Sequence, residues 1–322
     1  MDLRVFSGSA HRMLADAVAS TLGIGLGLCR LDRFPDGELS VRIEESVRGQ
    51  DVYIIQPTCP PVNDNLVELL LMIDALRRAA AGRITAIVPY FGYARQERRA
   101  TGREPITARL VADVLTSAGL DRVLMVDVHA PALEGFFDLE VDLLTAASEL
   151  AGQLARRKGP ESVLVAPDVG AVRRVDRFAD LLHLPTALML KRRVSSDSDS
   201  QVEVRAFVGE VRGRQPIIVD DMIATGSTIH ECVGALLDAG ALPRIIVVAT
   251  HAVLVGPALQ NLGHEAIKEV IVADTIPIPS CKRLPKMSVV SVAGLLAEAI
   301  RRLNHDQSLS ALSAVLPGRE RT

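Results

Sequence analysis

Apolar and polar positions follow two different rhythms along this chain of 322 residues. Short runs rich in Val and Ile predict strands, whereas longer stretches with an apolar residue every three or four positions predict helices. The predicted strands are 51–56, 84–89, 123–128, 162–167, 216–221, 244–250, 269–274 and 288–292. Because helical stretches separate these strands, we predict an α/β fold of doubly wound, mainly parallel sheets flanked by helices.

Three helices can be placed by their apolar faces. The first begins near Asn63 and Asp64, which we expect to cap it. Its apolar face comprises Leu66, Leu69, Leu70, Ile73 and Leu76. The second follows residue 228 and has an apolar face of Ile229, Val233, Leu236 and Leu237, with Gly240 at its end. The third is predicted at 292–303.

The length of the chain is sufficient for two domains with separate cores. The composition is 48% hydrophobic but only 3% aromatic, so the cores must be aliphatic, as they are in parallel sheets covered by helices. We place the boundary near residue 146, which gives an N-terminal domain at 1–146 and a C-terminal domain at 147–303. The tail, 304–322, is expected to pack on the N-terminal domain.

Charge and hydropathy argue against several classes of protein. The net charge of −3 argues against general nucleic-acid binding. No apolar run is long enough to span a membrane, and the first residues do not resemble a signal peptide. The four cysteines have neither the spacing of a metal site nor that of a disulfide framework. We therefore expect a cytoplasmic protein.

The strand predicted at 216–221 ends in two adjacent carboxylates, Asp220 and Asp221. Carboxylates at the end of a parallel strand can accept hydrogen bonds from a vicinal diol or help to hold a metal ion. A turn of small residues follows before the next helix, comprising Thr225, Gly226, Ser227 and Thr228. Backbone N–H groups and hydroxyls at a helix N-terminus suit a phosphate. Together these features predict a sugar-phosphate pocket, and the alternative is an ordinary capped turn.

Two other polar segments have side chains suited to a nucleotide. One turn holds Phe34, which can stack on a base, and Asp36 and Glu38, which can accept a hydrogen bond from an exocyclic amine. Its alternative is a simple surface turn. The basic cluster 191–193 precedes a run of Ser and Asp at 195–200, which predicts a flexible loop that closes over phosphates or, alternatively, a solvated basic turn.

Polar side chains also follow other predicted strands. The segment 89–99 comes directly after a strand and contains Arg95 and Gln96, which suit a polyphosphate. A charged loop on an aromatic anchor is the alternative there. His129 and Asp168 each follow a strand and could contact Mg²⁺ or phosphate if they converge, although a lone His at such a place is usually structural.

These segments occur in the order found in a known family. Over nearly its whole length the chain resembles ribose-phosphate pyrophosphokinases, which form 5-phosphoribosyl 1-diphosphate (PRPP). The segments that carry the resemblance are 33–38, 56–65, 74–78, 89–99, 105–108, 126–130, 191–193, 219–228 and 274–277. The resemblance implies two phosphoribosyltransferase-like domains. It also implies Mg²⁺-dependent transfer of the diphosphoryl group of ATP to the anomeric hydroxyl of ribose 5-phosphate, giving PRPP and AMP.

The resemblance further implies a role for each matching residue. Ribose 5-phosphate would be bound by Asp220, Asp221, Thr225, Gly226, Ser227 and Thr228. ATP would be bound by Arg95, Gln96 and His129, together with Phe34, Asp36 and Glu38 from a neighbouring subunit of a homo-oligomer, either a hexamer or another dimer-based assembly. His129 and Asp168 would contact the Mg²⁺ cofactor, and Lys191 and Arg193 would stabilise transition-state charge. Arg48, Ser308 and Ser310 match positions of an allosteric phosphate site.

Two positions depart from the family pattern. The family often has an acid where this chain has Ala224, and a Gly where it has Ser227. Because the carboxylate pair and the phosphate turn are retained, we expect altered affinity rather than loss of activity. Two alternatives remain open at this stage, namely a phosphoribosyltransferase that consumes PRPP and an inactive regulatory partner of a true synthase.

Overall fold

The computed structural model describes residues 1–195 and 201–312, with side chains for 1–190 and 206–312. This part of the chain divides into two compact units. The first unit contains 1–146, 275–277 and the described residues from Ser291 onward, and the second contains the described residues of 147–274 together with 278–290. The polypeptide therefore leaves the first unit after Ala146 and later returns to it twice.

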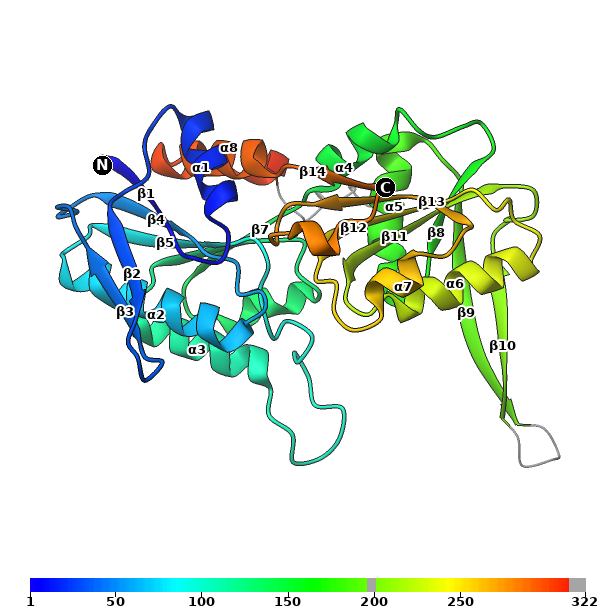
Figure 1. The fold of residues 1–322 in the computed structure, drawn as a ribbon, viewed down its shortest axis with the longest axis horizontal. Coiled ribbons are helices and arrows are strands. Elements are labelled where there is room, and N and C mark those ends of the chain that lie inside the picture. The colour runs from blue at the N-terminus through cyan, green and yellow to red at the C-terminus, as the bar shows by residue number, and fades with distance from the viewer. Residues whose placement is uncertain (196–200, 313–322) are drawn as a thin grey trace, which may run out of the picture. The chain divides into compact units, whose positions relative to one another are not determined.

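The first unit is built on a five-stranded sheet in the order β1-β4-β5-β6-β7, in which all neighbours are parallel. Its strands are β1 (Leu3–Ser7), β4 (Asp51–Ile55), β5 (Arg83–Val88), β6 (Arg122–Val126) and β7 (Glu140–Leu144). Its helices are α1 (Arg12–Leu22), α2 (Val62–Arg78), α3 (Thr107–Ala118) and α8 (Ala293–Asn304), with 3₁₀ helices η1 (Pro131–Phe136) and η4 (Ser310–Leu312). Figure 1 shows α1 and α8 on one face of this sheet and α2 and α3 on the other. With both faces covered, β4 is buried at every position.

Helix α8 corrects the predicted division of the chain. The sequence assigned 292–303 to a C-terminal domain, whereas α8 packs against α1 and belongs to the first unit. Arg83 of β5 donates a hydrogen bond of 3.1 Å to the carbonyl of Leu303. Beyond this helix, the N–H of Thr145 donates to the carbonyl of Leu312 at 3.1 Å. Residues 304–312 therefore lie against the first unit.

Helix α2 begins earlier than expected and without the expected cap. It starts at Val62 after Pro61, whose side chain makes no capping hydrogen bond. Asp64 lies in the first turn instead, where its negative charge interacts favourably with the positive end of the helix dipole. The Asn63 side chain is engaged elsewhere, because its Oδ1 accepts a hydrogen bond from the Tyr93 hydroxyl.

A separate antiparallel hairpin projects from the first unit. It consists of β2 (Cys29–Arg33) and β3 (Leu39–Ile43), and β3 packs on α2. The N–H of Phe34 donates to the carbonyl of Glu38 at 2.8 Å and closes the turn. Gly37 has a φ of +99°, a conformation that glycine adopts readily. The tip of the hairpin is therefore an ordered turn.

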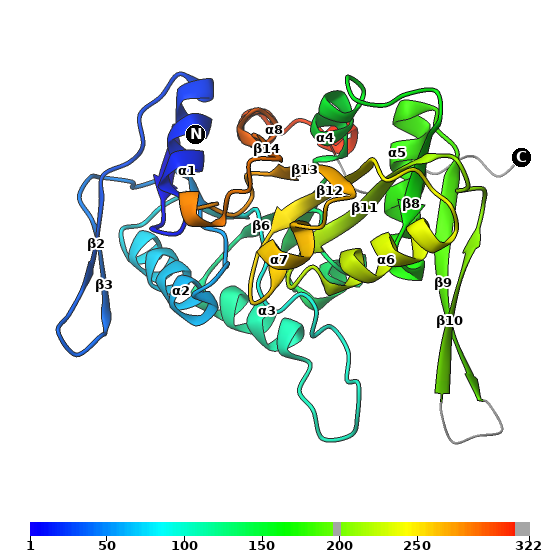
Figure 2. The same cartoon turned by 45° about the vertical axis from the view of Figure 1, so that its right-hand side comes forward.

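The second unit contains a seven-stranded sheet in the order β10-β9-β8-β11-β12-β13-β14. Its strands are β8 (Ser162–Ala166), β9 (Thr186–Ser195), β10 (Gln201–Val208), β11 (Gln215–Ile223), β12 (Ile245–Ala252), β13 (Ile267–Ala273) and β14 (Met287–Val290). Its helices are α4 (Ala147–Leu154), α5 (Val172–Leu182), α6 (Ser227–Asp238) and α7 (Ala258–Leu262), with 3₁₀ helices η2 (Val169–Ala171) and η3 (Ser280–Lys282). Figure 2 shows α4 and α5 on one face and α6 and α7 on the other. The predicted α/β class with doubly wound, mainly parallel sheets is confirmed.

Strand order reverses in the middle of this sheet. The chain passes from β8 through α5 to β9 on one side, and from β11 through α6 to β12 on the other. The neighbours β8 and β11 therefore form a topological switch point. Open α/β sheets bind ligands at the carboxyl ends of the strands at such a point.

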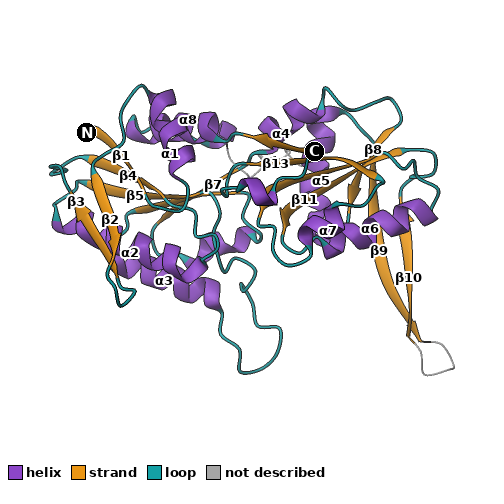
Figure 3. Ribbon diagram, in the orientation of Figure 1, coloured by secondary structure: helices purple, strands orange, loops and turns teal. Residues whose placement is uncertain are grey.

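Strands β9 and β10 form a ribbon that extends past the body of the sheet, as Figures 1 and 3 show. β9 pairs with β8 over Thr186–Leu188, and its pairing with β10 continues to Ser195. The sequence predicted a loop directly after 191–193, whereas this basic cluster lies within β9. Of the loop predicted at 195–200, Ser195 belongs to β9, and 196–200 lie outside the described residues.

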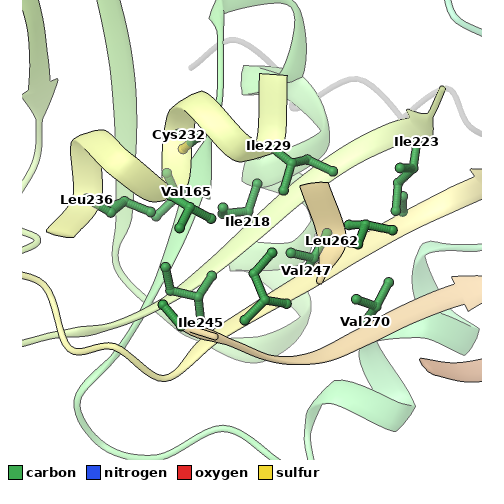
Figure 4. Packing of buried hydrophobic residues seen from close by; sticks show 14 of the residues in the cluster. Val165, Ile218, Ile223, Ile229, Cys232, Leu236, Ile245, Val247, Leu262 and Val270 are labelled. Atoms are coloured by element: carbon green, nitrogen blue, oxygen red, sulfur yellow. The ribbon is translucent and has the colours of Figure 1, made fainter. Parts of the chain in front are cut away.

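The core beneath α6 is aliphatic, as the composition predicted. Ile229, Cys232 and Leu236 of α6 point into it, and Ile218 of β11 and Val247 of β12 lie beneath the helix (Figure 4). Each of these five side chains is at most 1% exposed. This packing holds the N-terminus of α6 at the end of β11. No helix in the described ranges 1–195 and 201–312 is long and apolar enough to cross a membrane.

Candidate functional site

The adjacent carboxylates lie on the part of β11 that runs past one of its neighbours. β11 pairs with β8 up to Ile218, whereas its pairing with β12 continues to Ile223. Asp220 and Asp221 therefore stand at the switch point, beyond the end of β8. Their side chains are 16% and 5% exposed. The strand geometry thus concentrates two nearly buried carboxylates where this fold class binds ligands.

Arg174 of α5 holds this pair from a neighbouring helix. Its Nη1 lies 3.4 Å from Asp220 Oδ1, and its Nη2 lies 3.7 Å from Asp221 Oδ2. Burial raises the pKa of Asp220 well above its usual range, the Asp221 carboxylate raises it further, and Arg174 opposes both effects. One guanidinium thus stands against two carboxylates. Hydroxyl donors or a cation would relieve the repulsion between the two acids.

The turn after β11 offers donors to an anion. Gly226 has a φ of +71° and occupies the N-cap position of α6, where no side chain caps the helix. The N–H groups of Thr225 and Gly226 make no hydrogen bond within the part of the chain that the structure describes. The hydroxyls of Thr225 and Ser227 lie 2.9 Å apart, and both residues are exposed. N–H groups, hydroxyls and the helix dipole therefore favour a phosphate here.

Both departures from the family pattern occur in this turn. Ser227 supplies the hydroxyl that contacts Thr225 Oγ1, and this adds a polar group where the family often has none. Ala224 is half-buried, and its carbonyl accepts a hydrogen bond of 3.0 Å from the N–H of Val255. Neither substitution removes a donor that the turn presents.

Asp168 follows the strand that neighbours the one with the carboxylate pair. It follows β8, is exposed, and its Oδ1 accepts a hydrogen bond of 3.2 Å from the N–H of Ala171. Among the described residues, no group of three or more His, Cys, Asp or Glu side chains could hold a metal ion. Mg²⁺ is usually held by one or two carboxylates together with substrate phosphates and water. The carboxylates at the ends of β8 and β11 fit that mode of binding.

The segment after β5 forms a pocket in the first unit. The pocket has a volume of about 540 Å³ and is lined by Val62, Asn63, Tyr90, Tyr93, Ala94, Arg95 and Gln96. The Arg95 side chain is exposed. Gln96 Oε1 accepts a hydrogen bond of 2.6 Å from the Thr107 hydroxyl, at the start of α3. Tyrosine faces and an adjacent guanidinium suit a base or a polyphosphate.

The tip of the β2–β3 hairpin is held in place but uncovered. Arg33 donates to the carbonyl of Gly37 at 2.8 Å, and Asp36 Oδ1 accepts from the N–H of Glu38 at 3.1 Å. Phe34 as a residue is nevertheless 52% exposed. The structure thus places Phe34, Asp36 and Glu38 together on one turn, with an aromatic side chain that this chain leaves open to solvent.

The structure locates the remaining predicted site residues individually, without showing contacts among all of them. His129 follows β6 in the first unit and is exposed, whereas Asp168 belongs to the second unit. The side chains of Lys191 and Arg193 lie outside the described residues, although their backbone is part of β9. The remaining three residues are Arg48, which is exposed and precedes β4, and Ser308 and Ser310, whose hydroxyls lie 2.8 Å apart.

Arg174 was not predicted from the sequence. This arginine lies in the first turn of α5, which follows β8 and Asp168 in the chain. A basic residue at the start of a helix that follows a strand and an Asp is the signal that could have identified it. Tyr93, which lines the pocket of the first unit and donates a hydrogen bond to Asn63, was not predicted either.

Two family descriptions match separate parts of the chain. The N-terminal domain of ribose phosphate pyrophosphokinase matches residues 3–119. The phosphoribosyl synthetase-associated domain matches residues 204–314.

Relatives extend this similarity to nearly the whole chain. A ribose-phosphate pyrophosphokinase of Caldanaerobacter subterraneus subsp. tengcongensis is 47% identical over 311 residues, covering 96% of this chain and 97% of the relative. One of Pasteurella multocida is 47% identical over 315 residues, covering 97% and 99%. The crystal structure of phosphoribosylpyrophosphate synthetase from Mycobacterium smegmatis is 43% identical, with a TM-score of 0.87, and covers 95% of this chain and 100% of that chain. With such similarity over nearly its whole length, the chain belongs to the ribose-phosphate pyrophosphokinase family.

Proposed function

We propose that this chain transfers the diphosphoryl group of ATP to ribose 5-phosphate. The anomeric hydroxyl attacks the β-phosphorus, the bond from that phosphorus to the α-phosphate oxygen breaks, and the hydroxyl proton is released. PRPP and AMP result. Such a transfer depends on in-line positioning and on neutralising phosphate charge more than on a strong base.

One observation carries the proposal. At the switch point of the second unit, Asp220 and Asp221 precede a turn whose free N–H groups and hydroxyls suit a phosphate. The carboxylates would accept hydrogen bonds from the ribose hydroxyls, and Thr225, Gly226, Ser227 and Thr228 would bind the 5-phosphate. A sugar phosphate carries both a diol and a phosphate, and so it suits the carboxylates and the turn at the same time.

ATP would be bound chiefly by the first unit. Arg95 and Gln96 line a pocket with two tyrosines, and His129 would contact the triphosphate. Lys191 and Arg193 would stabilise the charge that develops during transfer. Phe34, Asp36 and Glu38 would contact the adenine of an ATP molecule that is bound to a neighbouring subunit. The exposure of Phe34 in the single chain supports that assignment.

The carboxylates near the switch point suit Mg²⁺ as cofactor. Asp168, Asp220 and Asp221 offer hard oxygen ligands, and His129 would contact the ion or the triphosphate. When bound, Mg²⁺ neutralises phosphate charge and aligns the phosphates. The same proposal includes a homo-oligomer in the cytoplasm, with Arg48, Ser308 and Ser310 forming a regulatory phosphate site.

The decisive experiment is ³¹P NMR of the protein with ATP, Mg²⁺ and ribose 5-phosphate. Signals of AMP and of a new diphosphate ester are expected, appearing together and in equal amounts. ADP would instead indicate transfer of a single phosphoryl group and would overturn the mechanism. An inactive protein, with and without added inorganic phosphate, would favour the regulatory-partner alternative. Release of diphosphate from added PRPP by a nucleobase would favour a phosphoribosyltransferase.

A further inference from the structure

The turn assigned to the 5-phosphate is held through its carbonyl oxygens. Four successive carbonyls each accept a hydrogen bond: Ile223 from Leu254 N (2.9 Å), Ala224 from Val255 N (3.0 Å), Thr225 from Asn261 Nδ2 (2.8 Å) and Gly226 from His230 N (2.9 Å). Carbonyls bound in this way are not free to turn toward a ligand. The N–H groups of Thr225 and Gly226 remain available to an anion.

Asn261 differs from the other donors. The other three are backbone N–H groups, which a substitution leaves in place, whereas Asn261 uses its side-chain amide. Asn261 also lies close to Gly226, because a Cβ added to Gly226 would lie 3.2 Å from the Asn261 Cβ. Its side chain therefore fixes the carbonyl of Thr225 and lies beside the residue with positive φ that follows it.

Asn261 lies on helix α7, which is held in position by packing. Ala258 and Leu262, at 1% and 0% exposure, belong to the core beneath α6. Leu262 belongs to the same buried cluster as Ile223, the last residue of β11, and Figure 4 labels both. The N–H of Asn261 donates to the carbonyl of Pro257 at 2.9 Å. The amide of Asn261 is thus carried by a short helix whose inner face is locked by packing.

We propose that Asn261 is a positioning residue for the phosphate of ribose 5-phosphate, and this inference rests on the proposed function of the turn. Asn261 acts through Thr225 and makes no contact with substrate. While its amide holds the Thr225 carbonyl, the turn presents donors to the phosphate. Without that hydrogen bond, the peptide between Thr225 and Gly226 is free to rotate, and the carbonyl oxygen then repels the anion.

The test compares variants at Asn261 with a variant at its neighbour. Asn261→Leu removes the donor and keeps the branching of the side chain, whereas Asn261→His retains a donor, because Nδ1 of histidine is as many bonds from the backbone as Nδ2 of asparagine. Gln260→Leu is the matched control, since Gln260 is exposed on the same helix. Each variant is assayed for kcat and for KM of both substrates, and calorimetry gives the Kd of ribose 5-phosphate without ATP.

For Asn261→Leu we expect KM and Kd for ribose 5-phosphate to rise about fivefold, equivalent to one neutral hydrogen bond of about 1 kcal/mol. The KM for ATP and the kcat at saturation should stay unchanged. Asn261→His should restore the affinity, because it keeps a donor at the same place, and Gln260→Leu should match the wild type.

Two results would overturn the inference and can be told apart from failure of the proposed function. An unchanged Kd in Asn261→Leu would show that the amide does not position the turn. A lower kcat together with a higher KM for ATP, neither of them rescued by histidine, would indicate general damage to the fold. If the wild-type protein itself neither binds ribose 5-phosphate nor forms AMP, the proposed function fails first.

Discussion

Asp220 and Asp221 are neighbours in the sequence, so their carboxylates stay close enough to repel each other when the chain folds. Folding also removes both from most of the solvent, and Arg174 is placed against both. The outcome is a raised pKa for Asp220, caused first by burial and then by Asp221. In the free protein near neutral pH, this carboxyl therefore retains its proton more readily than a surface acid does.

This electrostatic balance predicts the pH dependence of substrate capture. If Asp220 must be ionised to accept the ribose hydroxyls, kcat/KM for ribose 5-phosphate falls as pH falls through its raised pKa. Arg174→Gln removes a positive charge that lowers this pKa. The low-pH side of the kcat/KM profile, its acid limb, should therefore move to higher pH by about one unit. Arg173→Gln, on the exposed side of the same helix, should leave the limb in place. A limb at the same pH in all three proteins would show that Asp220 is not the titrating group.

At the scale of elements, sequence patterns predicted best what local chemistry decides. The apolar runs of β5, β8 and β11 and the apolar face of α6 were placed within a few residues. The turn after the acids was also predicted, but it is shorter than expected, because α6 begins at Ser227 and not after Thr228. The edge strand β7 was missed, since five residues with two acids lack a clear apolar run. β1 was missed as well.

Partners in space were harder to predict than elements. The periodicity of α8 shows which of its faces is apolar but not which helix covers that face, and so α8 was assigned to the wrong domain. Arg174 was missed for a similar reason. Its importance comes from β8 and β11 being neighbours across a crossover, and residue spacing along the chain does not reveal that pairing.

The β9–β10 ribbon offers a test at this scale. Lys191 lies on β9 beyond the pairing with β8, in the part of the strand that pairs with β10. If it stabilises the transition state, Lys191→Ala should lower kcat at least about 100-fold. The Kd of ribose 5-phosphate should change little, because the carboxylates and the phosphate turn are intact. Arg192→Ala is the control, as the family resemblance assigns no role to that residue; an unchanged kcat in Lys191→Ala would remove Lys191 from the mechanism.

At the scale of the whole chain, one buried network attaches the C-terminal helix to the first unit. Asp51 is fully buried and accepts hydrogen bonds from Arg83 (2.7 Å), Tyr53 (2.8 Å) and Asn304 (2.9 Å). Burial opposes ionisation of Asp51, but the hydrogen bonds from these three partners outweigh it and lower its pKa. The ionised carboxylate therefore stabilises the folded state at neutral pH.

Removing the arginine should destabilise the first unit in a pH-dependent way. Arg83→Met leaves the Asp51 charge buried without its main partner, which should lower the free energy of unfolding by about 3 kcal/mol at pH 7. In the wild type the contribution is present above the unfolded pKa and is lost as pH falls through the lowered folded pKa. In the variant, burial is no longer outweighed and favours the protonated form of Asp51, so the difference between the two proteins should shrink as pH falls from 7 toward about 4.

Tyrosine emission can follow this unfolding selectively. The chain has three tyrosines and no tryptophan, and Tyr53, Tyr90 and Tyr93 all lie in the first unit. Arg78→Gln is the control, since Arg78 and its partner Asp74 form an exposed pair. A difference between Arg83→Met and wild type that is the same at pH 4 and pH 7 would argue against a charged Asp51.

Assembly gives the last prediction. If the hairpin of one subunit completes the ATP site of another, then two inactive variants should restore activity when mixed. One carries Lys191→Ala, and the other carries Phe34→Ala with Glu38→Ala; Asp36 is retained because it holds the turn. After dissociation and reassembly at equal amounts, a site is whole only when Lys191 and the hairpin come from different parents. This has a probability of one half times one half, so about one quarter of wild-type activity is expected. If each hairpin instead served its own subunit, every site would lack one part and mixing would restore nothing.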